Sequence, residues 1–161
     1  MAAEYVFIDE WDVAAPPEAV FDALADARTY PDWWKPVYIS AEGDGPPEVG
    51  RVTKHHFKGR LPYTLKTTSE VVAIDAPRRV EAKVVGDLAG TGIWTLTPTE
   101  TGTHVQFDWR VNADRGFIRV LTPVLRPLFR WNHNWAIARA TEGLEPYAKR
   151  TAAAALAEPT S

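Results

Sequence analysis

Three polar side chains stand among apolar residues, and each carries a group that acid–base chemistry needs. Asp9 interrupts a row of aromatic residues at alternating positions of residues 4–13. Burying an unpaired carboxylate costs several kcal/mol, so Asp9 must meet a donor, take up a proton or reach solvent. His133 offers an imidazole that moves protons near neutral pH, and Arg130 offers a permanent cation. We predict that His133 is a general acid/base, Asp9 its partner and Arg130 the stabiliser of an enolate.

Each of these residues also has an ordinary structural role that the sequence leaves open. Asp9 would then accept a backbone N–H or lie near an open end of the sheet, and His133 would be a hydrogen-bonded helix residue. Arginines such as Arg126 and Arg130 often lay their aliphatic stems on apolar surface while the guanidinium stays in water.

Metal, redox and covalent chemistry find no support in the residue types. The chain has no cysteine, and His55 and His56 are adjacent on a predicted strand, so their rings project to opposite faces and cannot chelate one ion. Which of the two faces the interior stays open. No serine lies in a Gly-x-Ser-x-Gly turn. We therefore predict no metal and no cofactor.

Aromatic residues at alternating strand positions are the candidate ligand-binding wall. Trp94 and Leu96 share one face of a predicted strand, and Phe107 and Trp109 share a face of the next. On the first strand and the last helix, Trp11 and Phe129 are the inward candidates. The predicted ligand-binding residues are therefore Trp11, Trp94, Leu96, Phe107, Trp109 and Phe129.

The elements that must position these side chains follow from periodicity and turn residues. A strand over residues 4–13 leads into a helix opened by Pro16 and Pro17, and Pro31 breaks a second short helical turn. Strands are predicted at residues 37–42, 51–58, 63–74, 79–85, 93–97 and 104–111, with turn residues between them. Residues 113–123 are predicted as a crossing segment. A long helix then runs from near Pro127 to about Arg150.

This order of elements predicts an α+β fold in one domain, residues 1–150, followed by a flexible alanine-rich tail, residues 151–161. Seven antiparallel strands with one apolar face, and a single long helix to cover that face, indicate a curved sheet wrapped around the helix. Such a sheet leaves a deep pocket for a ligand between itself and the helix.

Several short segments resemble the START-like superfamily (SRPBCC), in its polyketide cyclase/dehydrase and lipid-transport branch. The matching segments are APPEAVFDAL from Ala15, YPDWW from Tyr30, DAPRR from Asp75, GIWTLTP from Gly92, GTHV from Gly102, and Gly143-Leu144 in the last helix. The resemblance covers almost the whole chain. It implies a helix-grip fold whose cavity binds hydrophobic molecules such as sterols, lipids or polyketides, without specifying an activity.

A second aromatic group lies on the other side of the long helix. Leu128, Trp131 and Trp135 form a stripe along one side of the helix, the side that carries polar residues further toward its C-terminus. Three alternatives stay open: cover by residues 117–125 or by the tail, a homodimer contact, or a shift of the early helix at Pro127 that turns the indoles inward. Residues 117–125 are also a candidate lid over the pocket entrance, the alternative being an ordinary packed connection.

Composition narrows the class of partner. The 161 residues carry 18 Lys and Arg against 21 Asp and Glu, so there is no basic excess to neutralise nucleic acid. No basic segment precedes an apolar run and no apolar stretch reaches about 20 residues, which predicts a cytoplasmic protein without stable membrane insertion. The predicted function is the binding of a small hydrophobic, aromatic, polyketide- or lipid-like molecule. The alternatives are a polyketide cyclase, aromatase or dehydratase, and an interaction protein that uses the tryptophan stripe.

Overall fold

A computed structural model describes residues 3–60, 64–113 and 116–157 of the chain. In chain order the elements are β1 (Ala3–Val13), α1 (Pro17–Ala25), the 3-10 turn η1 (Ala27–Thr29), α2 (Tyr30–Trp33), β2 (Tyr38–Gly43), β3 (Val52–Phe57), β4 (Leu65–Asp75), β5 (Arg79–Gly86), β6 (Leu88–Pro98), β7 (Thr103–Ala113) and α3 (Gly116–Ala157).

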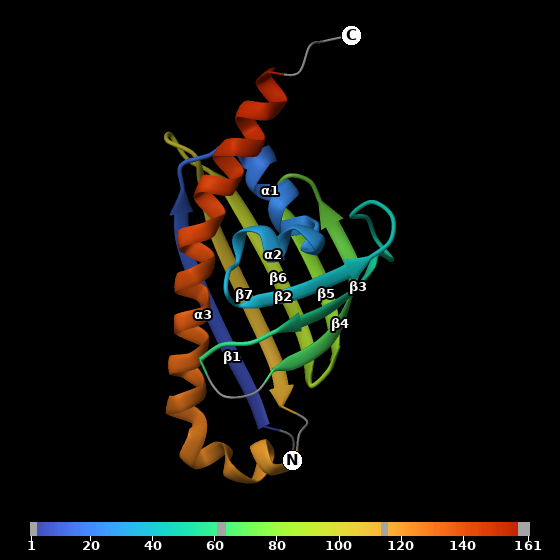
Figure 1. Ribbon diagram of the computed structural model, residues 1–161, viewed down its shortest axis with the longest axis vertical. Coiled ribbons are helices and arrows are strands. Elements are labelled where there is room, and N and C mark those ends of the chain that lie inside the picture. Colours follow the sequence, from blue (N-terminus) through green and yellow to red (C-terminus); the bar gives the residue numbers. More distant parts are fainter. Residues whose placement is uncertain (1–2, 61–63, 114–115, 158–161) are drawn as a thin grey trace.

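The strands form one antiparallel seven-stranded sheet in the order β1-β7-β6-β5-β4-β3-β2. The first and second strands of the chain therefore lie at opposite edges, joined through α1, η1 and α2. Figure 1 shows the sheet curving around one side of α3. The predicted helix-grip architecture is confirmed: a curved seven-stranded sheet, two short helices after the first strand and a long C-terminal helix.

The bounds of α3 differ from the prediction at both ends. The helix begins at Gly116, so the predicted crossing segment over residues 113–123 is wrong, and it ends at Ala157 rather than near Arg150. A proline inside a helix lacks the N–H that would bond to the preceding turn, and its ring crowds the carbonyl of that turn, so the helix bends there. Figure 1 shows α3 changing direction after its first turns. At the other end, a run of alanines has the highest helix propensity.

The two interpretations that involve residues 117–125, a lid and a cover for the tryptophan stripe, concern side chains outside the described ones.

The second half of α3 packs one apolar face against the rest of the fold. Ile137, Ala140, Leu144 and Ala148 are all buried against the sheet and the short helices. Gly143 contacts the backbone carbonyl of Trp33 so closely that a Cβ atom would overlap it. The indole of Trp34 donates to the carbonyl of Ala136 at 2.8 Å, which fixes α2 to the same helix.

Strand β6 begins earlier than predicted, because two glycines that suggest a loop lie within the strand. A Cβ atom on Gly90 would overlap the carbonyl of Arg110 on β7, and one on Gly92 would lie 3.1 Å from the ring of Trp109. These glycines therefore allow close approach of the neighbouring strand and its indole rather than a turn.

Candidate functional site

An internal cavity of about 140 Å³ lies between the sheet, α2 and the middle of α3. We call it the inner chamber. Its wall on β6 and β7 is aromatic: Trp94 and Phe107 stack with ring centroids 4.0 Å apart, and Phe107 and Trp109 follow at 5.6 Å. Tyr30 and Trp34 of α2 also line it. The inner chamber is therefore shaped by flat rings from both layers.

A second cavity of about 120 Å³, the outer chamber, adjoins the first. Tyr5 and Phe7 of β1, Phe129 of α3 and Lys58 of the β3–β4 connection are among its lining residues. Both chambers share the lining residues Val37, Phe57, Trp109, His133 and Ala136. The two chambers are thus neighbouring parts of one site, and His133 lies where they meet.

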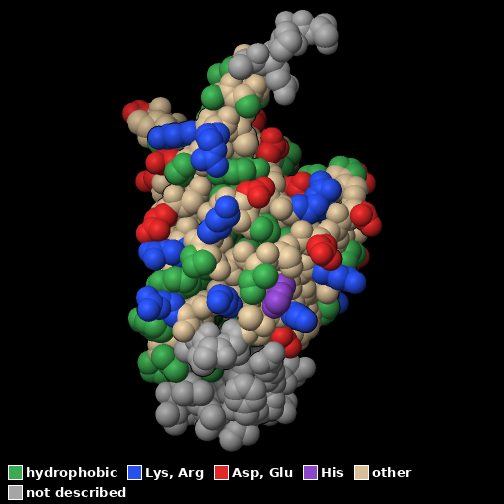
Figure 2. Space-filling model, viewed as in Figure 1, with side chains coloured by type: hydrophobic (Ala, Val, Ile, Leu, Met, Phe, Trp, Pro, Cys, Tyr) green, Lys and Arg blue, Asp and Glu red, His purple; other side chains and the backbone are tan. Residues whose placement is uncertain are grey.

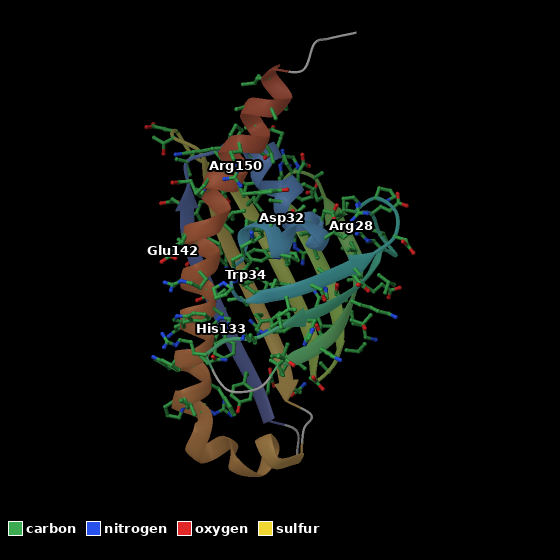
Figure 3. All side chains as sticks on the ribbon, in the orientation of Figure 1. Arg28, Asp32, Trp34, His133, Glu142 and Arg150 are labelled. Carbon is green, nitrogen blue, oxygen red and sulfur yellow. The ribbon has the colours of Figure 1, made fainter. Side chains whose placement is uncertain are left out.

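His133 and Asp9 form an ion-pair geometry at this junction. The distance from His133 Nε2 to Asp9 Oδ2 is 2.7 Å, and both side chains are largely buried. Phe7 stacks on the imidazole with ring centroids 3.9 Å apart. Figure 3 shows His133 and Trp34 beside α3, on the side of the helix that faces the sheet.

The sequence predicts that Asp9, as a carboxylate among apolar residues, needs a hydrogen-bond donor, and this pairing supplies one. Its donor is His133, which follows 124 residues later in the chain. An ionised carboxylate only accepts hydrogen bonds, so Nε2 carries the proton and Nδ1 of a neutral ring keeps its lone pair. The predicted base and partner therefore lie together, in the arrangement in which a carboxylate orients a histidine base.

The third member of the predicted catalytic group lies elsewhere. Arg130 is exposed, and its guanidinium sits 5.6 Å from the centroid of the Phe7 ring instead of lining either chamber. The structure therefore does not place Arg130 where it would contact an enolate in the cavity.

The predicted ligand-binding residues divide into two groups. Trp94, Phe107 and Trp109 line the inner chamber, and Trp109 and Phe129 line the outer one. Trp11 and Leu96 line neither: Trp11 packs edge-on against Trp94 at 6.0 Å, and Leu96 is a buried core residue. These two inward-facing residues support the wall from outside the cavity.

His55, and not His56, faces the interior. Its side chain lines the inner chamber and is buried, and its Nε2 lies 2.7 Å from Ser69 Oγ on the next strand. Burial lowers the pKa of His55 to about 4, so the ring is neutral in ordinary buffers. Within the described residues its Nδ1 has no hydrogen-bond partner.

Burial also raises the pKa of two tyrosines in the same chamber wall, Tyr30 and Tyr38. The Tyr30 hydroxyl donates to the carbonyl of Leu24 at 2.6 Å and accepts from the Trp94 indole at 3.2 Å. Both phenols therefore stay protonated, and Tyr30 is fixed as part of the frame.

Reasoning from the sequence missed the polar residues on β3 and β4 that line the chamber, which are Thr53, Thr67 and Ser69. A signal for them exists, because they fall in the same alternating rows as the apolar residues Phe57 and Val71. Hydroxyls at the inward positions of a buried strand are the pattern to look for.

The tryptophan stripe on α3 is only partly exposed. Leu128 and Trp131 are 41% and 49% exposed, whereas Trp135 is half-buried. The guanidinium groups of Arg60 and Arg139 lie 5.7 and 5.4 Å from the Trp135 ring. Arginine stacking thus covers one indole, a fourth explanation beyond those left open by the sequence.

The outer surface shows mixed charge. On the face shown in Figure 2, acidic and basic side chains are interspersed. Within residues 3–60, 64–113 and 116–157, no helix has the length and apolar character needed to cross a membrane. Over the same ranges, no three acidic or histidine side chains gather closely enough to hold a metal ion.

Solved structures of other proteins share this fold at low sequence identity. The Zhui aromatase/cyclase from Streptomyces sp. R1128 is 17% identical, with a TM-score of 0.75 over 95% of this chain and 98% of its own. TTHA0849 from Thermus thermophilus is 17% identical, with a TM-score of 0.74 over 92% and 99%. A norcoclaurine synthase from Thalictrum flavum is 15% identical, with a TM-score of 0.61 over 94% and 98%.

No curated protein sequence matches the chain. The family model described as polyketide cyclase / dehydrase and lipid transport matches residues 8–150, which run from the middle of β1 through most of α3. The chain belongs to the polyketide cyclase/dehydrase and lipid-transport family.

Proposed function

We propose that the chain binds a small, flat, hydrophobic molecule across the two chambers. The observation that carries this proposal is a wall of stacked rings, formed by Trp94, Phe107 and Trp109, beside unfilled volume. Well-oriented aromatic contacts add about 0.5–1.5 kcal/mol beyond the area buried, so such a wall favours flat ligands. A cavity of about 150 Å³ can hold a benzene ring, so two neighbouring chambers suit a two-ring molecule.

The family description supports a chemical character for the proposed ligand. It joins polyketide cyclases and dehydrases with lipid transport, and the Zhui protein is an aromatase/cyclase. Both support a polyketide- or lipid-like molecule over a charged metabolite. The inner chamber fits this character, because its lining is mostly aromatic and aliphatic.

Titration of the full chain with 2-naphthol, followed by tryptophan fluorescence, tests the binding proposal. We expect a saturable response in the wild type and binding about fivefold weaker in Trp109→Leu, which removes a ring shared by both chambers. Trp131→Leu is the matched control, because this indole lies on the outer surface of α3 and lines neither chamber. The absence of saturation in the wild type, or equal losses in the two variants, contradicts the proposal.

A second candidate function is proton transfer at a carbon next to a carbonyl, which cyclisation and dehydration both require. The specific observation in its favour is the Asp9–His133 pair at the junction of the chambers. In this step His133 Nδ1 removes the α-proton, the C–H electron pair becomes the enolate, and Asp9 stabilises the imidazolium that results. No covalent intermediate is needed.

Deuterium exchange at the methyl group of 2-acetonaphthone, followed by NMR in D₂O, tests this step without knowledge of the natural substrate. Positioned bases accelerate proton transfer by about 10²–10⁴-fold, so we expect exchange to fall to the buffer rate in His133→Gln and by a smaller factor in Asp9→Asn. His104→Gln is the matched control, because His104 also pairs with an aspartate, Asp12, but on the exposed outer face. Equal exchange in the wild type and in His133→Gln refutes the assignment.

A further inference from the structure

A patch of polar side chains lines the inner chamber on the side formed by β2, β3 and β4. It consists of Tyr38, Thr53, His55, Thr67 and Ser69, and we call it the polar wall. His55 pairs directly with Thr67, and Thr53 with Ser69, in the register of β3 and β4. Four of the five residues are therefore cross-strand neighbours on one inward face, while the aromatic wall belongs to β6 and β7.

The polar wall has hydrogen-bonding groups that the folded chain does not use. Within the described residues, no hydrogen bond engages the hydroxyls of Tyr38, Thr53 and Thr67, although both threonines are buried. Buried hydroxyls are nearly always bonded. Thr103 follows this rule, because its Oγ1 donates to the carbonyl of Ala15 at 2.8 Å. Among the buried threonines that the structure describes, the two without a hydrogen bond, Thr53 and Thr67, are the two that line the cavity.

The imidazole in the wall adds a group that can act either as a donor or as an acceptor. Ser69 Oγ lies 2.7 Å from Nε2 of His55, and Nδ1 has no partner in the described part of the chain. Rotation of the serine hydroxyl selects either tautomer of the neutral ring, so Nδ1 can adapt to its partner. Valine at the threonine positions would fill the same space without these groups, as Val71 and Val84 do nearby.

Apart from His133, which already pairs with Asp9, the described residues that line the inner chamber offer no charged side chain to bind an ion. Among the described residues that line it, none is an aspartate, glutamate, lysine or arginine. The burial that lowers the pKa of His55 to about 4 keeps the ring neutral at higher pH. A carboxylate or ammonium group on the ligand would lose its hydration in this chamber without gaining a counter-ion.

We propose that the polar wall recognises an uncharged oxygen substituent, a hydroxyl or a carbonyl, on the ring that enters the inner chamber. This inference rests on the proposed binding function and adds a class of ligand and an orientation to it. The oxygen-bearing ring lies between the polar wall and the aromatic wall. The rest of the molecule extends past His133 into the outer chamber.

Equilibrium dialysis of the full chain against two probes of nearly equal shape, 2-naphthol and 2-methylnaphthalene, tests the inference. The wild type should prefer 2-naphthol. In Thr67→Val that preference should fall about fivefold, the ordinary effect of one lost hydrogen bond, while 2-methylnaphthalene binding stays the same or strengthens. The melting temperature of Thr67→Val should be unchanged or higher, because the substitution removes a cavity-lining hydroxyl that has no hydrogen-bond partner among the described residues. Thr68→Val, one position along on the outer face of β4, is the matched control.

The outcomes separate this inference from the proposed function. If the wild type binds both probes but Thr67→Val keeps the same preference, the polar wall does not recognise the oxygen substituent. The inference then fails, while the proposed binding function stands. If Thr67→Val loses both probes together with thermal stability, the threonine is structural and the inference is again overturned. If the wild type binds neither probe, the proposed function fails and the inference fails with it. Binding of 2-naphthoate as tight as that of 2-naphthol refutes the restriction to uncharged ligands.

Discussion

The buried imidazole of His55 should make the folded protein lose stability in mild acid. Burial lowers the pKa of His55 to about 4 in the folded chain, from an ordinary value of 6.5. As the pH falls below 6.5, the unfolded chain takes up a proton that the folded chain does not bind until the pH nears 4. The free energy of unfolding therefore falls through this window. At about 1.36 kcal/mol per pKa unit, the loss approaches roughly 3 kcal/mol.

Urea unfolding of the wild type and His55→Gln, at several values between about pH 4.5 and 7.5, measures this loss. Glutamine can still bond to Ser69 but does not titrate, so the difference between the two proteins isolates His55. We expect the wild type to lose stability more steeply than the variant as the pH falls from about 6.5 toward 4.5, and the two curves to run parallel above about pH 6.5. Parallel curves for the two proteins across this range would refute the buried, neutral state of His55.

His104→Gln controls for the loss of a histidine as such. The hydrogen bonds that His104 makes to Asp12 and Glu10 raise its pKa above 6.5. A raised pKa contributes stability that is present below the unfolded value and is lost as the pH rises through the folded value. Between about pH 4.5 and 6.5 this variant should therefore be less stable than the wild type by a constant amount, and the difference should disappear as the pH rises above 6.5. The lowered pKa of Asp26 acts below its ordinary 3.8 and so lies outside the window.

Three further substitutions test the packing that shapes the site. Gly143→Ala should lower the melting temperature, because the overlap of the new methyl group with the Trp33 carbonyl costs about 1–3 kcal/mol or more. This cost outweighs the gain of about 1 kcal/mol in helix propensity. A higher melting temperature would contradict the close packing of α3 against Trp33. Gly92→Ala should weaken 2-naphthol binding severalfold at near-normal stability, because the new methyl group presses on the Trp109 ring, and unchanged affinity in dialysis would oppose this. Thr103→Val should cost about 1–3 kcal/mol in urea unfolding, since it leaves a buried carbonyl without its donor, and a neutral result would dispute the bond.

Much of the fold is readable from the sequence because its signals are local. Alternation along a strand reports which side chains point inward, so the buried positions of Phe107 and Val111 follow from neighbouring residues alone. The same applies to the inward face of α3, including Leu144. Local signals misplaced the helix ends and the start of β6, because prolines and glycines mark both turns and sites of close packing.

The candidate site could be predicted only in part. Asp9 and His133 are each conspicuous in the sequence, as polar groups within apolar patterns. Arg130 is equally conspicuous, yet it lies outside the cavity. A pattern along the chain says that a polar residue is out of place, but not which partner accounts for it. Threonines such as Thr67 pass unnoticed, because threonine is common in ordinary strands.

The inward rows of the strands and of the helix can be predicted from the sequence alone, because periodicity depends on residues a few positions apart. Which of those residues meet around empty space depends on the packing of distant elements. The packing of α3 against β1 joins His133 to Asp9 across 124 residues of chain. The register of β3 and β4 gathers the polar wall. Trp11 and Leu96 share the inward parity of Trp94, yet they serve as core, because the curvature of the sheet leaves open volume only beside some of its inward residues.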